Sequence, residues 1–333
     1  MTRRILVTGG TGCIGSATVR ALFAGGADEV VVTSSTGRPG SLSLWLDPTQ
    51  EPRLRLTTLD VGEADDVQRV VSEVRPTHVV HLGALQTPDC DAHPERGMRV
   101  NVGGTLHLLA AAEKVGTVER FTFASSAAVY GLRSEYPGAT VRETDALTPP
   151  NLYGAWKLAS EQLCRQFAGR TGIPTVSLRL NTTYGPGRDR GKTSAVTRAM
   201  KEVAAAAVHG DTVRFRMPYG GRENYHYVED VAAQFAAVTL DAFDGYAAFN
   251  IRGETIPVTE FLDRIAMAAG AHGVVADLAI ESDAPPNPFV CDLDDSSIQS
   301  RFDGLPRTAL ETGIERTLQT FVSLARRGDL PLD

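Results

Sequence analysis

Residues 4–23 read RILVTGGTGCIGSATVRALF, and this stretch decides the fold class. Residues 4–8 are a short, mostly apolar run, residues 9–15 form a glycine-rich turn, and residues 16–23 have the composition of a helix. A strand that passes through a tight turn into a helix is the opening of a βαβ unit. The stretch therefore predicts a parallel sheet covered by helices.

The spacing of the glycines adds a chemical prediction. Gly9, Gly12 and Gly15 stand three residues apart between the predicted strand and helix. Without side chains, the backbone can approach a pyrophosphate closely, and the N–H groups of the helix N-terminus attract that anion. A tight turn alone explains many such triplets, but the flanking strand and helix favour a dinucleotide site. Cys13 and Ile14 are expected at the same site, with the Cys13 thiol either acidified by the helix N-terminus or simply packed as a small residue.

Further short apolar runs predict the rest of the sheet. They occupy residues 30–33, 54–58, 78–82, 121–124 and 175–180, with helix-compatible stretches between most of them. Strands that alternate with helices are typical of an α/β fold, a Rossmann-type doubly wound parallel sheet.

The alternation degrades after about residue 182, where a Gly/Arg-rich loop precedes an alanine-rich helix at residues 194–208. Residues 225–240 and 247–251 look like a helix and a strand that return to the main sheet. We therefore expect a dinucleotide-binding Rossmann domain and a smaller C-terminal substrate-binding lobe. The former is expected at residues 1–181 plus about 225–251, and the latter at residues 182–224 and 252–333.

The composition argues against several kinds of partner. The 333 residues carry 33 Lys and Arg against 40 Asp and Glu, a formal net charge of −7. Nucleic acids and anionic membranes attract a concentrated cationic face, so we expect neither as a partner. No run approaches the roughly 20 apolar residues of a membrane span. The apolar stretch behind Arg3 and Arg4 is too short for a secretion signal, and four scattered cysteines without CxxC spacing suggest no metal site, no disulfide framework and a reducing cytoplasm.

Two more strand ends are predicted to line a cofactor. Asp60 and Val61 lie between a strand and a helix, so the Asp60 carboxylate could accept a hydrogen bond from an adenine amino group. The alternative is a helix N-cap. Residues 81–85, HLGAL, are small or apolar and would let a cofactor lie across them, although a buried strand end explains them equally well.

Tyr153 and Lys157 form the strongest local signal for catalysis. Their i,i+4 spacing on a predicted helix places the ammonium near the phenol. A tyrosine with its ordinary pKa of about 10 is a poor base at neutral pH, so we expect Lys157 to lower that pKa. Ser125 and Ser126 follow a buried strand at the sheet edge where α/β folds bind ligands, and a hydroxyl there could bond the reacting oxygen, the alternative being a serine that caps a turn.

The assembled pattern resembles the extended short-chain dehydrogenases, the NAD-dependent epimerase/dehydratase family, over roughly the first 250 residues. The motifs are TGGTGCIG from Thr8, Asp60-Val61, HLGA from His81, NVGGT from Asn101, SSAAVYG from Ser125, YGAWK from Tyr153, RLNTTYGPG from Arg179 and YVEDV from Tyr227. In order, these motifs are highly specific for fold and cofactor class.

The resemblance implies an NAD(P)-dependent enzyme that exchanges hydride with a hydroxyl-bearing carbon. Tyr153 would be the acid/base, Ser126 the catalytic serine, and Lys157 would also hold the nicotinamide ribose. Asn101 would join the network near the active site. The residues expected along the nicotinamide nucleotide are Leu82, Gly83 and Ala84. Relatives also pack helices equivalent to residues 100–115 and 152–169 in a four-helix contact, so a homodimer is expected.

The chain departs from the family pattern in places that bear on the substrate. Dehydrating members usually carry an acidic residue just after the catalytic hydroxyl, where this chain has Ala127 and Ala128, which favours oxidoreduction or epimerisation. Nucleotide-sugar members typically show Arg-x-x-Asn before the YGP turn, where this chain has Thr182 with Asn181 one residue early.

A second diphosphate contact is also displaced. The family usually has an arginine seven residues before the aspartate of the late DV motif, where this chain has Glu223 with Arg222 one early. The lobe nevertheless contains a set of basic residues that we expect near the substrate mouth, which favours an anionic substrate, although solvated charges on a loop are the alternative. The set is Arg188, Arg190, Lys192, Arg214, Arg216 and Arg222. Substrate contacts are expected from Ser126, Asn181, Thr182, Arg188 and Arg222.

The end of the second strand decides between NAD and NADP. An acidic side chain there would accept from the ribose 2′-OH, but this chain has Ser34, and Arg38 is close enough to meet a 2′-phosphate. This tilts the prediction slightly toward NADP. The alternative, that Arg38 is simply a surface loop residue, stays open. The expected function is that of an NAD(P)-dependent oxidoreductase or epimerase of the nucleotide-sugar epimerase type, which transfers hydride at a secondary alcohol of a sugar-like, anionic substrate. The alternatives are a net dehydrogenase or reductase of a non-nucleotide sugar acid or hydroxy acid, and a non-catalytic module that senses NAD(P).

Overall fold

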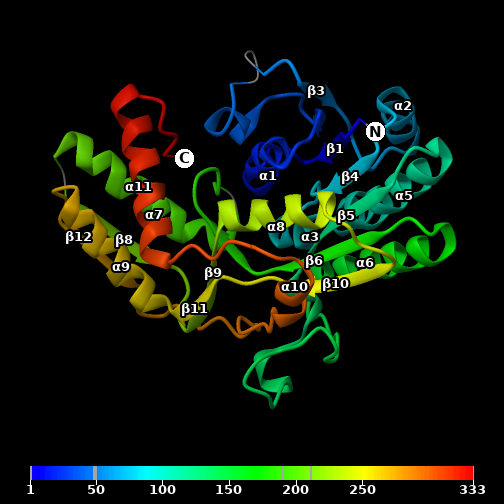
Figure 1. The fold of residues 1–333 in the computed structure, drawn as a ribbon. Coiled ribbons are helices and arrows are strands. Elements are labelled where there is room, and N and C mark those ends of the chain that lie inside the picture. Colours follow the sequence, from blue (N-terminus) through cyan, green and yellow to red (C-terminus); the bar gives the residue numbers. More distant parts are fainter. Residues whose placement is uncertain (1, 48–50, 190, 211, 333) are drawn as a thin grey trace.

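The computed structural model describes residues 2–47, 51–189, 191–210 and 212–332, and for Lys192 the backbone alone. Seven parallel strands form the central sheet in the order β10-β6-β5-β4-β1-β2-β3 (Figure 1). The strands are β1 Arg4–Thr8, β2 Glu29–Ser34, β3 Leu54–Thr58, β4 His78–His81, β5 Arg120–Ser126, β6 Thr175–Leu180 and β10 Tyr246–Asn250. The predicted Rossmann-type sheet is therefore confirmed.

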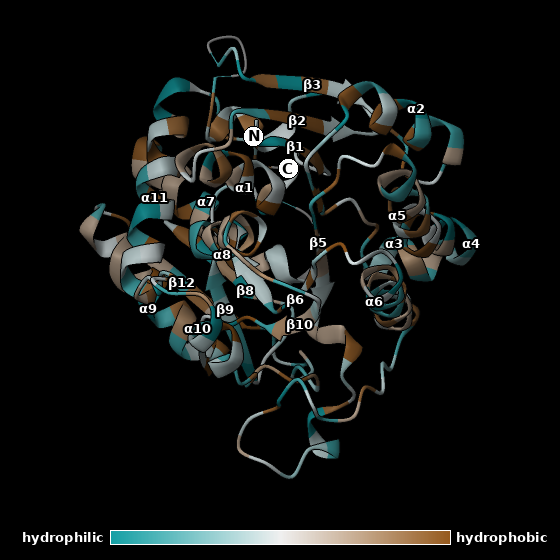
Figure 2. Cartoon of the chain, turned by 45° about the vertical axis from the view of Figure 1, so that its right-hand side comes forward, coloured by the Kyte–Doolittle hydropathy of each residue, from teal (hydrophilic) through white to brown (hydrophobic). Residues whose placement is uncertain are grey.

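Helices cover both faces of this sheet, which explains its continuous apolar strands. Ile5 and Val7 of β1 pack toward α1 (Cys13–Ala24) and α8 (Val228–Leu240). Leu6, between them, faces the opposite side. That side is covered by α2 Ala64–Val74, α5 Gly104–Val115 and α6 Leu152–Thr171. In Figure 2, α2 carries both hydrophilic and hydrophobic stretches, as expected for a helix with one buried face.

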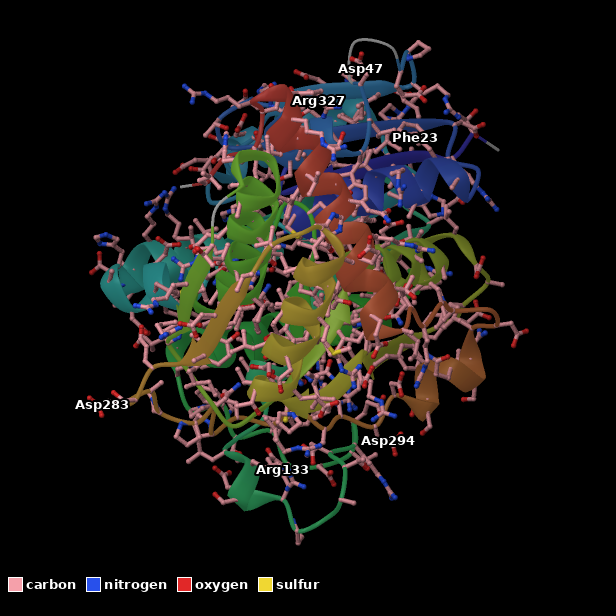
Figure 3. All side chains as sticks on the ribbon, turned by 90° about the vertical axis from the view of Figure 1, so that its left-hand side faces the viewer. Phe23, Asp47, Arg133, Asp283, Asp294 and Arg327 are labelled. Carbon is pink, nitrogen blue, oxygen red and sulfur yellow. The ribbon has the colours of Figure 1, made fainter. Side chains whose placement is uncertain are left out.

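Two smaller sheets lie outside the main one. β7 (Thr182–Tyr184), β9 (Arg222–Tyr227) and β11 (Glu254–Pro257) form one, and β8 (Val213–Met217) pairs in parallel with β12 (Ala276–Ile280). The helices α7 Ala195–His209, α9 Val258–Ala271 and α11 Leu310–Arg327 pack with them around a separate apolar core. Figure 3 shows this lobe from the side, with α11 running beside α7.

The boundaries of three predicted elements differ from expectation. The helix expected from residue 225 begins at Val228, because residues 222–227 pair with β7 and β11 as a strand. The first helix begins at Cys13, inside the predicted turn. A π-helical turn, Arg99–Gly103, precedes α5. Three further short α-helices in the described part of the chain are α3 Thr87–Ala92, α4 Pro94–Met98 and α10 Ser296–Arg301.

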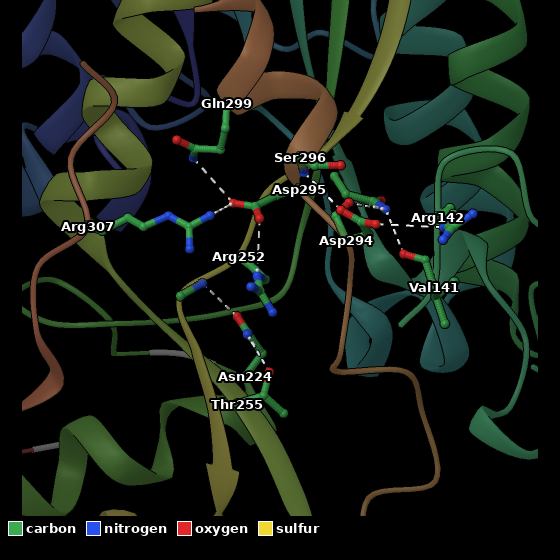
Figure 4. Close-up of polar contacts among 12 residues, drawn as sticks. Val141, Arg142, Asn224, Arg252, Thr255, Asp294, Asp295, Ser296, Gln299 and Arg307 are labelled. Carbon is green, nitrogen blue, oxygen red and sulfur yellow. Dashed lines mark hydrogen bonds and ion pairs between the residues drawn. The ribbon is translucent and has the colours of Figure 1, made fainter. Parts of the chain in front are cut away.

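The segment around residues 285–308 is held against the sheet by polar contacts (Figure 4). The Asp295 carboxylate accepts hydrogen bonds from Arg252 at 3.1 Å and from Arg307 at 2.5 Å. The Asn250 amide donates to the carbonyl oxygens of Val141 and Asp294, both at 3.1 Å. These contacts fix the course of a segment whose earlier part, residues 287–290, reaches the site described below. Among the described residues, no helix is long and apolar enough to cross a bilayer.

Candidate active site

A cleft of about 1410 Å³ runs along the carboxyl edge of the main sheet. The segments that follow β1 to β6 line one side of it, and the smaller lobe lines the other. Ligands of open α/β sheets bind at this edge, since loops from neighbouring parallel strands converge there. The cleft is therefore the candidate active site, and each predicted residue can be placed against it.

The glycine turn after β1 has the shape that a pyrophosphate requires. Gly9 has a φ of +67°, and a Cβ on it would lie 2.7 Å from the backbone nitrogen of Gly83. A Cβ on Gly15 would lie 2.3 Å from the carbonyl oxygen of Gly9. The helix α1 starts directly after Gly12, and its first turn contains no acidic side chain. Its N–H groups therefore remain available to an anion, and the turn fits a dinucleotide.

Cys13 and Ile14 line this part of the cleft, but the thiol is not acidified. Burial raises the pKa of Cys13 to about 12, and its Sγ lies 3.7 Å from the carbonyl oxygen of Pro186. The prediction of small-residue packing is therefore the correct one. A thiol with this pKa is almost entirely protonated at neutral pH and is a weak nucleophile.

Ser34, Arg38, Asp60 and Val61 line the end of the cleft beside β2 and β3, where the adenosine of the cofactor is expected. The Ser34 hydroxyl accepts a hydrogen bond from the Gly37 N–H at 3.0 Å, and Arg38 is exposed. Asp60 accepts from the Gly62 N–H at 2.9 Å. The helix α2 is preceded by Glu63, so the alternative that Asp60 is its N-cap is wrong.

Leu82, Gly83 and Ala84 line the cleft after β4. Asn101 lies behind them and is 3% exposed. Its side-chain oxygen accepts from the Leu85 N–H at 2.8 Å, and its amide nitrogen donates to the Leu85 carbonyl at 3.0 Å. Both ends of the carboxamide are thus engaged with the backbone of the turn. Asn101 shapes the cleft wall rather than lining it, because the π-helical turn carries its side chain inward.

Ser126, Tyr153 and Lys157 come together where β5 meets the start of α6. Ser126 ends β5, accepts a hydrogen bond from the Ala128 N–H at 3.1 Å and hydrogen-bonds the Tyr153 hydroxyl. Lys157 is buried, and its Nζ donates to the Ala124 carbonyl at 2.7 Å and lies 5.7 Å from the centre of the Tyr153 ring. Asn151 caps α6 by accepting from the Gly154 N–H at 2.8 Å, which fixes the turn that carries Tyr153.

The ionisation of these groups differs in one respect from the prediction. Burial raises the pKa of Tyr153, whereas the hydrogen bond with Ser126 and the charge of Arg188 oppose that rise. The expectation that Lys157 lowers the phenol pKa below its ordinary value is therefore wrong for this structure. Burial lowers the pKa of Lys157 itself to about 8, which leaves a cation that is easily neutralised.

A buried ion pair supports this arrangement from behind. Arg179 on β6 donates to both carboxylate oxygens of Glu161 on α6, at 2.9 and 2.8 Å. The Ser125 hydroxyl donates to the same carboxylate, so it is turned toward Glu161 while the Ser126 hydroxyl meets Tyr153. The pair ties β5, β6 and α6 together at the level of the site. The two adjacent serines thus have different partners, Glu161 for Ser125 and Tyr153 for Ser126.

The substrate side of the cleft contains only part of the predicted set. Asn181, Thr182 and Arg188 line it. Arg222 does not, because it lies on the exposed face of β9, where it donates to the Thr255 carbonyl at 3.2 Å. Side chains alternate along a strand, so the next residue, Glu223, faces the cleft instead.

The expected gathering of arginines at the mouth is also wrong in part. Arg214 and Arg216 project outward from β8 and pair with Asp277 of β12 at 3.1 and 2.7 Å. Arg190 and the side chain of Lys192 lie outside the described residues. Arg188 is thus the member of the predicted set that the structure places on the cleft.

Several lining residues were missed by sequence reasoning. Glu223 was noted only as a departure from the family pattern, and the segment 287–290 was assigned no role although Asn287 and Phe289 line the cleft. The period-2 alternation of β9 could have identified Glu223. No local signal marks residues 287–290, since they reach the cleft through contacts between segments far apart in the sequence.

Comparison with known proteins places this geometry in a family. The model of the NAD dependent epimerase/dehydratase family matches residues 5–251. A UDP-glucose 4-epimerase of Lacticaseibacillus casei is 30% identical over 261 residues, covering 74% of this chain and 75% of that protein. A dTDP-glucose 4,6-dehydratase of Neisseria meningitidis serogroup B is 26% identical over 349 residues, covering 96% and 93%.

The solved structures agree with the sequence matches. The crystal structure of a Thermus thermophilus UDP-glucose 4-epimerase in complex with NAD superposes with a TM-score of 0.77 at 29% identity, covering 96% of this chain and 98% of that one. The fold and the family predicted from the motifs are both confirmed. The chain belongs to the NAD dependent epimerase/dehydratase family and is an enzyme of the extended short-chain dehydrogenase type.

Proposed function

We propose that this enzyme is an NAD-dependent epimerase that oxidises a secondary alcohol of an anionic, sugar-type substrate and then reduces it again from either face. The observation that carries the proposal is the hydrogen-bonded pair Ser126 and Tyr153 beside the buried Lys157, at the sheet edge that also holds the glycine turn. Ala127 and Ala128 follow Ser126, so this position offers no carboxyl group for proton transfer in a dehydration. That favours epimerisation over the dehydratase chemistry named for some relatives.

Each side chain has a defined task. Tyr153 removes the proton of the substrate hydroxyl and later returns it, and Ser126 hydrogen-bonds the same substrate oxygen as its charge changes. Lys157 contributes positive charge near the phenol and a donor for the nicotinamide ribose. When bound, NAD accepts the hydride and its nicotinamide adds the positive charge that a buried phenol needs in order to ionise. Arg188 adds a second cation on the substrate side.

We further propose that the adenosine end accepts the 2′-phosphate of NADP as well as the 2′-hydroxyl of NAD. Ser34 occupies the place of the usual acid, so no carboxylate at that position repels a phosphate, and the exposed Arg38 lines the same end. Titration of the nucleotide-free protein with both cofactors tests this. A Kd for NADP within about tenfold of that for NAD supports it, and a loss of NADP binding alone in Arg38→Ala identifies the phosphate contact.

The second candidate function is net dehydrogenation of a non-nucleotide sugar acid, because the acidic side chain of Glu223 in the cleft disfavours the diphosphate of a nucleotide sugar. Mass spectrometry of the nucleotide released from the denatured purified protein separates the two. Stoichiometric retained NAD, with no lasting change in absorbance at 340 nm during turnover, supports the epimerase. Nucleotide-free protein that releases reduced cofactor in step with substrate supports the dehydrogenase.

We also propose that the enzyme is a homodimer formed through α5 and α6. Leu106 and Leu152 on these helices, and Met98 just before them, are large apolar side chains that are 50%, 41% and 55% exposed. Their exposure on or just before the two helices of the predicted four-helix contact supports burial against a second copy.

A further inference from the structure

We propose that the substrate is a compact sugar acid and not a sugar joined to a nucleoside diphosphate, with Arg188 binding its carboxylate and Glu223 accepting its hydroxyl groups. The proposal rests on the function proposed above and adds a substrate class to it. It follows from how charge is distributed over the substrate side of the cleft.

Arg188 is positioned next to the reacting end. It lines the cleft, and its charge acts on the pKa of Tyr153, of Cys13 and of Tyr219, which places the guanidinium among these three groups. One terminal nitrogen donates to the Thr193 hydroxyl at 2.7 Å. The Nε atom is buried without a hydrogen-bond partner, so the guanidinium keeps an unsatisfied donor beside the cleft. A carboxylate on or next to the reacting carbon could use that free donor.

The neighbouring acid does not neutralise Arg188. The Asp189 carboxylate lies 2.5 Å from the Nζ of the buried Lys201 on α7. Among the described lining residues that come from beyond residue 181, Arg188 is the sole cation. One unshared positive charge suits a single carboxylate, whereas a diphosphate brings two negative charges.

Glu223 brings an acidic side chain to the cleft, in contrast to the basic side chain of Arg188. Its side chain is 3% exposed, and its oxygens accept from the Asn224 N–H at 2.9 Å and from the Asn287 amide at 2.6 Å. Thr182 adds a hydrogen bond. All of these partners are neutral, and burial raises the pKa of Glu223 to about 7. A second anion placed against this carboxyl group would meet repulsion, and none of its described hydrogen-bond partners is a cation that could offset it.

The titratable groups that face Glu223 do not change this balance. Tyr219 and Tyr225 have pKa values raised by burial, and burial raises the pKa of Cys291 to about 12, so all three are neutral at pH 7. The orientation of Glu223 is fixed by its neighbour: the Asn224 amide donates to the Thr255 hydroxyl at 2.8 Å, and its oxygen accepts from the Gly253 N–H at 3.0 Å (Figure 4). These bonds hold Asn224 toward β11 and Glu223 toward the cleft.

The same region offers hydrogen bonds suited to hydroxyl groups. The amide nitrogen of Asn181 and the hydroxyl of Thr183 are buried in the cleft wall without partners. The bond from Asn287 to Glu223 joins β9 to the segment 287–290, so two walls of the cleft meet there. A chain of hydroxyls that ends in one carboxylate would satisfy the two donors, the Glu223 acceptor and the Arg188 cation together.

Binding to the NAD-loaded Tyr153→Phe enzyme tests the proposal without turnover. Isothermal titration calorimetry would use a panel of hexuronates, hexonates and pentonates, with UDP and UDP-glucose as the competing class. We expect at least one sugar acid to bind with a Kd below about 1 mM, and UDP and UDP-glucose to bind at least about tenfold more weakly. Binding of UDP more tightly than every acid, or binding of no acid, would overturn the proposal.

Variants assign the two ends of the subsite. Arg188→Ala should weaken acid binding about tenfold or more, with partial recovery in Arg188→Lys. Arg222→Ala, on the same lobe but outside the cleft, should leave acid binding unchanged. Glu223→Gln should strengthen UDP binding about tenfold, whereas the exposed Glu281→Gln should change neither acid binding nor UDP binding. Equal losses in Arg188→Ala and Arg222→Ala, or unchanged UDP binding in Glu223→Gln, would contradict the assigned roles.

Turnover separates this inference from the proposed function. Wild-type enzyme that epimerises or oxidises UDP-glucose would refute the sugar-acid inference and leave the hydride chemistry standing. Tight acid binding with neither inversion of a carbon of the acid, followed by NMR, nor reduced cofactor at 340 nm would refute the proposed function and leave the sugar-acid inference standing.

Discussion

The two halves of the cleft are built by different means. The cofactor half is made by backbone: Gly9 and Gly15 approach neighbouring main-chain atoms so closely that a Cβ has no room, and α1 starts directly behind them. The substrate half is made by side chains from segments far apart in the chain, such as Glu223 and Asn287. A backbone site tolerates little variation, whereas a side-chain site can change its charge with one substitution. The cofactor half therefore carries the family's chemistry, and the substrate half carries what is particular to this enzyme.

The largest effect is expected where the halves meet. Tyr153→Phe removes the proposed acid/base and should lower kcat by about a thousandfold, because general acid–base catalysis contributes factors of this order. NAD binding should change little, since Lys157 and the glycine turn remain. Steady-state kinetics with the assigned substrate, together with a cofactor titration, measure both. Full activity in this variant would remove Tyr153 from the mechanism.

The next largest effect concerns the substrate half and is a pH dependence of the free energy of unfolding that arises from Glu223. Glu223 has a folded-state pKa of about 7, above the 4.5 of a free glutamate, so the folded protein holds an extra proton between these values. Its contribution to stability is present below about pH 4.5 and is lost as pH rises to about 7, by an amount on the order of 3 kcal/mol. Relative to Glu223→Gln, the free energy of unfolding of the wild type should therefore fall across this window and stay level above it.

Chemical denaturation at a series of pH values measures that difference. The exposed Glu281→Gln provides the matched control and should show a level difference across the same window. A wild-type curve that runs parallel to the Glu223→Gln curve would mean that the carboxyl group is solvated, and the charge contrast between the two halves would then disappear.

A smaller effect isolates the cofactor half. A methyl group on Gly15 would lie 2.3 Å from the Gly9 carbonyl oxygen, so the backbone must shift. Gly15→Ala should weaken NAD binding by about thirtyfold, since strain of this kind is worth about 2 kcal/mol. Gly169→Ala is the control: nothing lies within 4 Å of that position, which is exposed on α6. It should stabilise the helix by up to about 1 kcal/mol and leave NAD binding unchanged. Equal NAD affinities in both variants would contradict the account of the turn.

The smallest effect on the cleft is expected from the proposed dimer surface. Leu106 is 50% exposed on α5, away from both halves. Leu106→Glu should shift the protein from dimer to monomer in light scattering coupled to size-exclusion chromatography, because a charge cannot be buried there unpaired. NAD affinity should change by less than about threefold. A wild-type monomer would refute the dimer proposal directly.

The contrast between the halves also explains how far the sequence could predict the structure. The glycine turn, the strand ends and the Tyr153–Lys157 pair are each formed by residues close together in the sequence. Their positions in the cleft therefore follow from the local sequence pattern. The inward turn of Asn101 depends on a π-helical turn that no spacing signals. The substrate wall depends on the register of β9 against β7 and β11, and a shift by one residue exchanges Arg222 for Glu223. Charge in a loop sequence therefore predicted the substrate side less well than the alternation of one strand would have done.

The central claim is that hydride leaves the substrate carbon and comes back to it. Turnover in D₂O, followed by mass spectrometry and NMR of the product, tests this most directly. The account predicts that the inverted carbon keeps its original hydrogen, because the hydride stays on the cofactor and does not exchange with solvent. Deuterium at that carbon would show that the enzyme removes a proton instead, and the roles assigned to Ser126, Tyr153 and Lys157 would then be wrong.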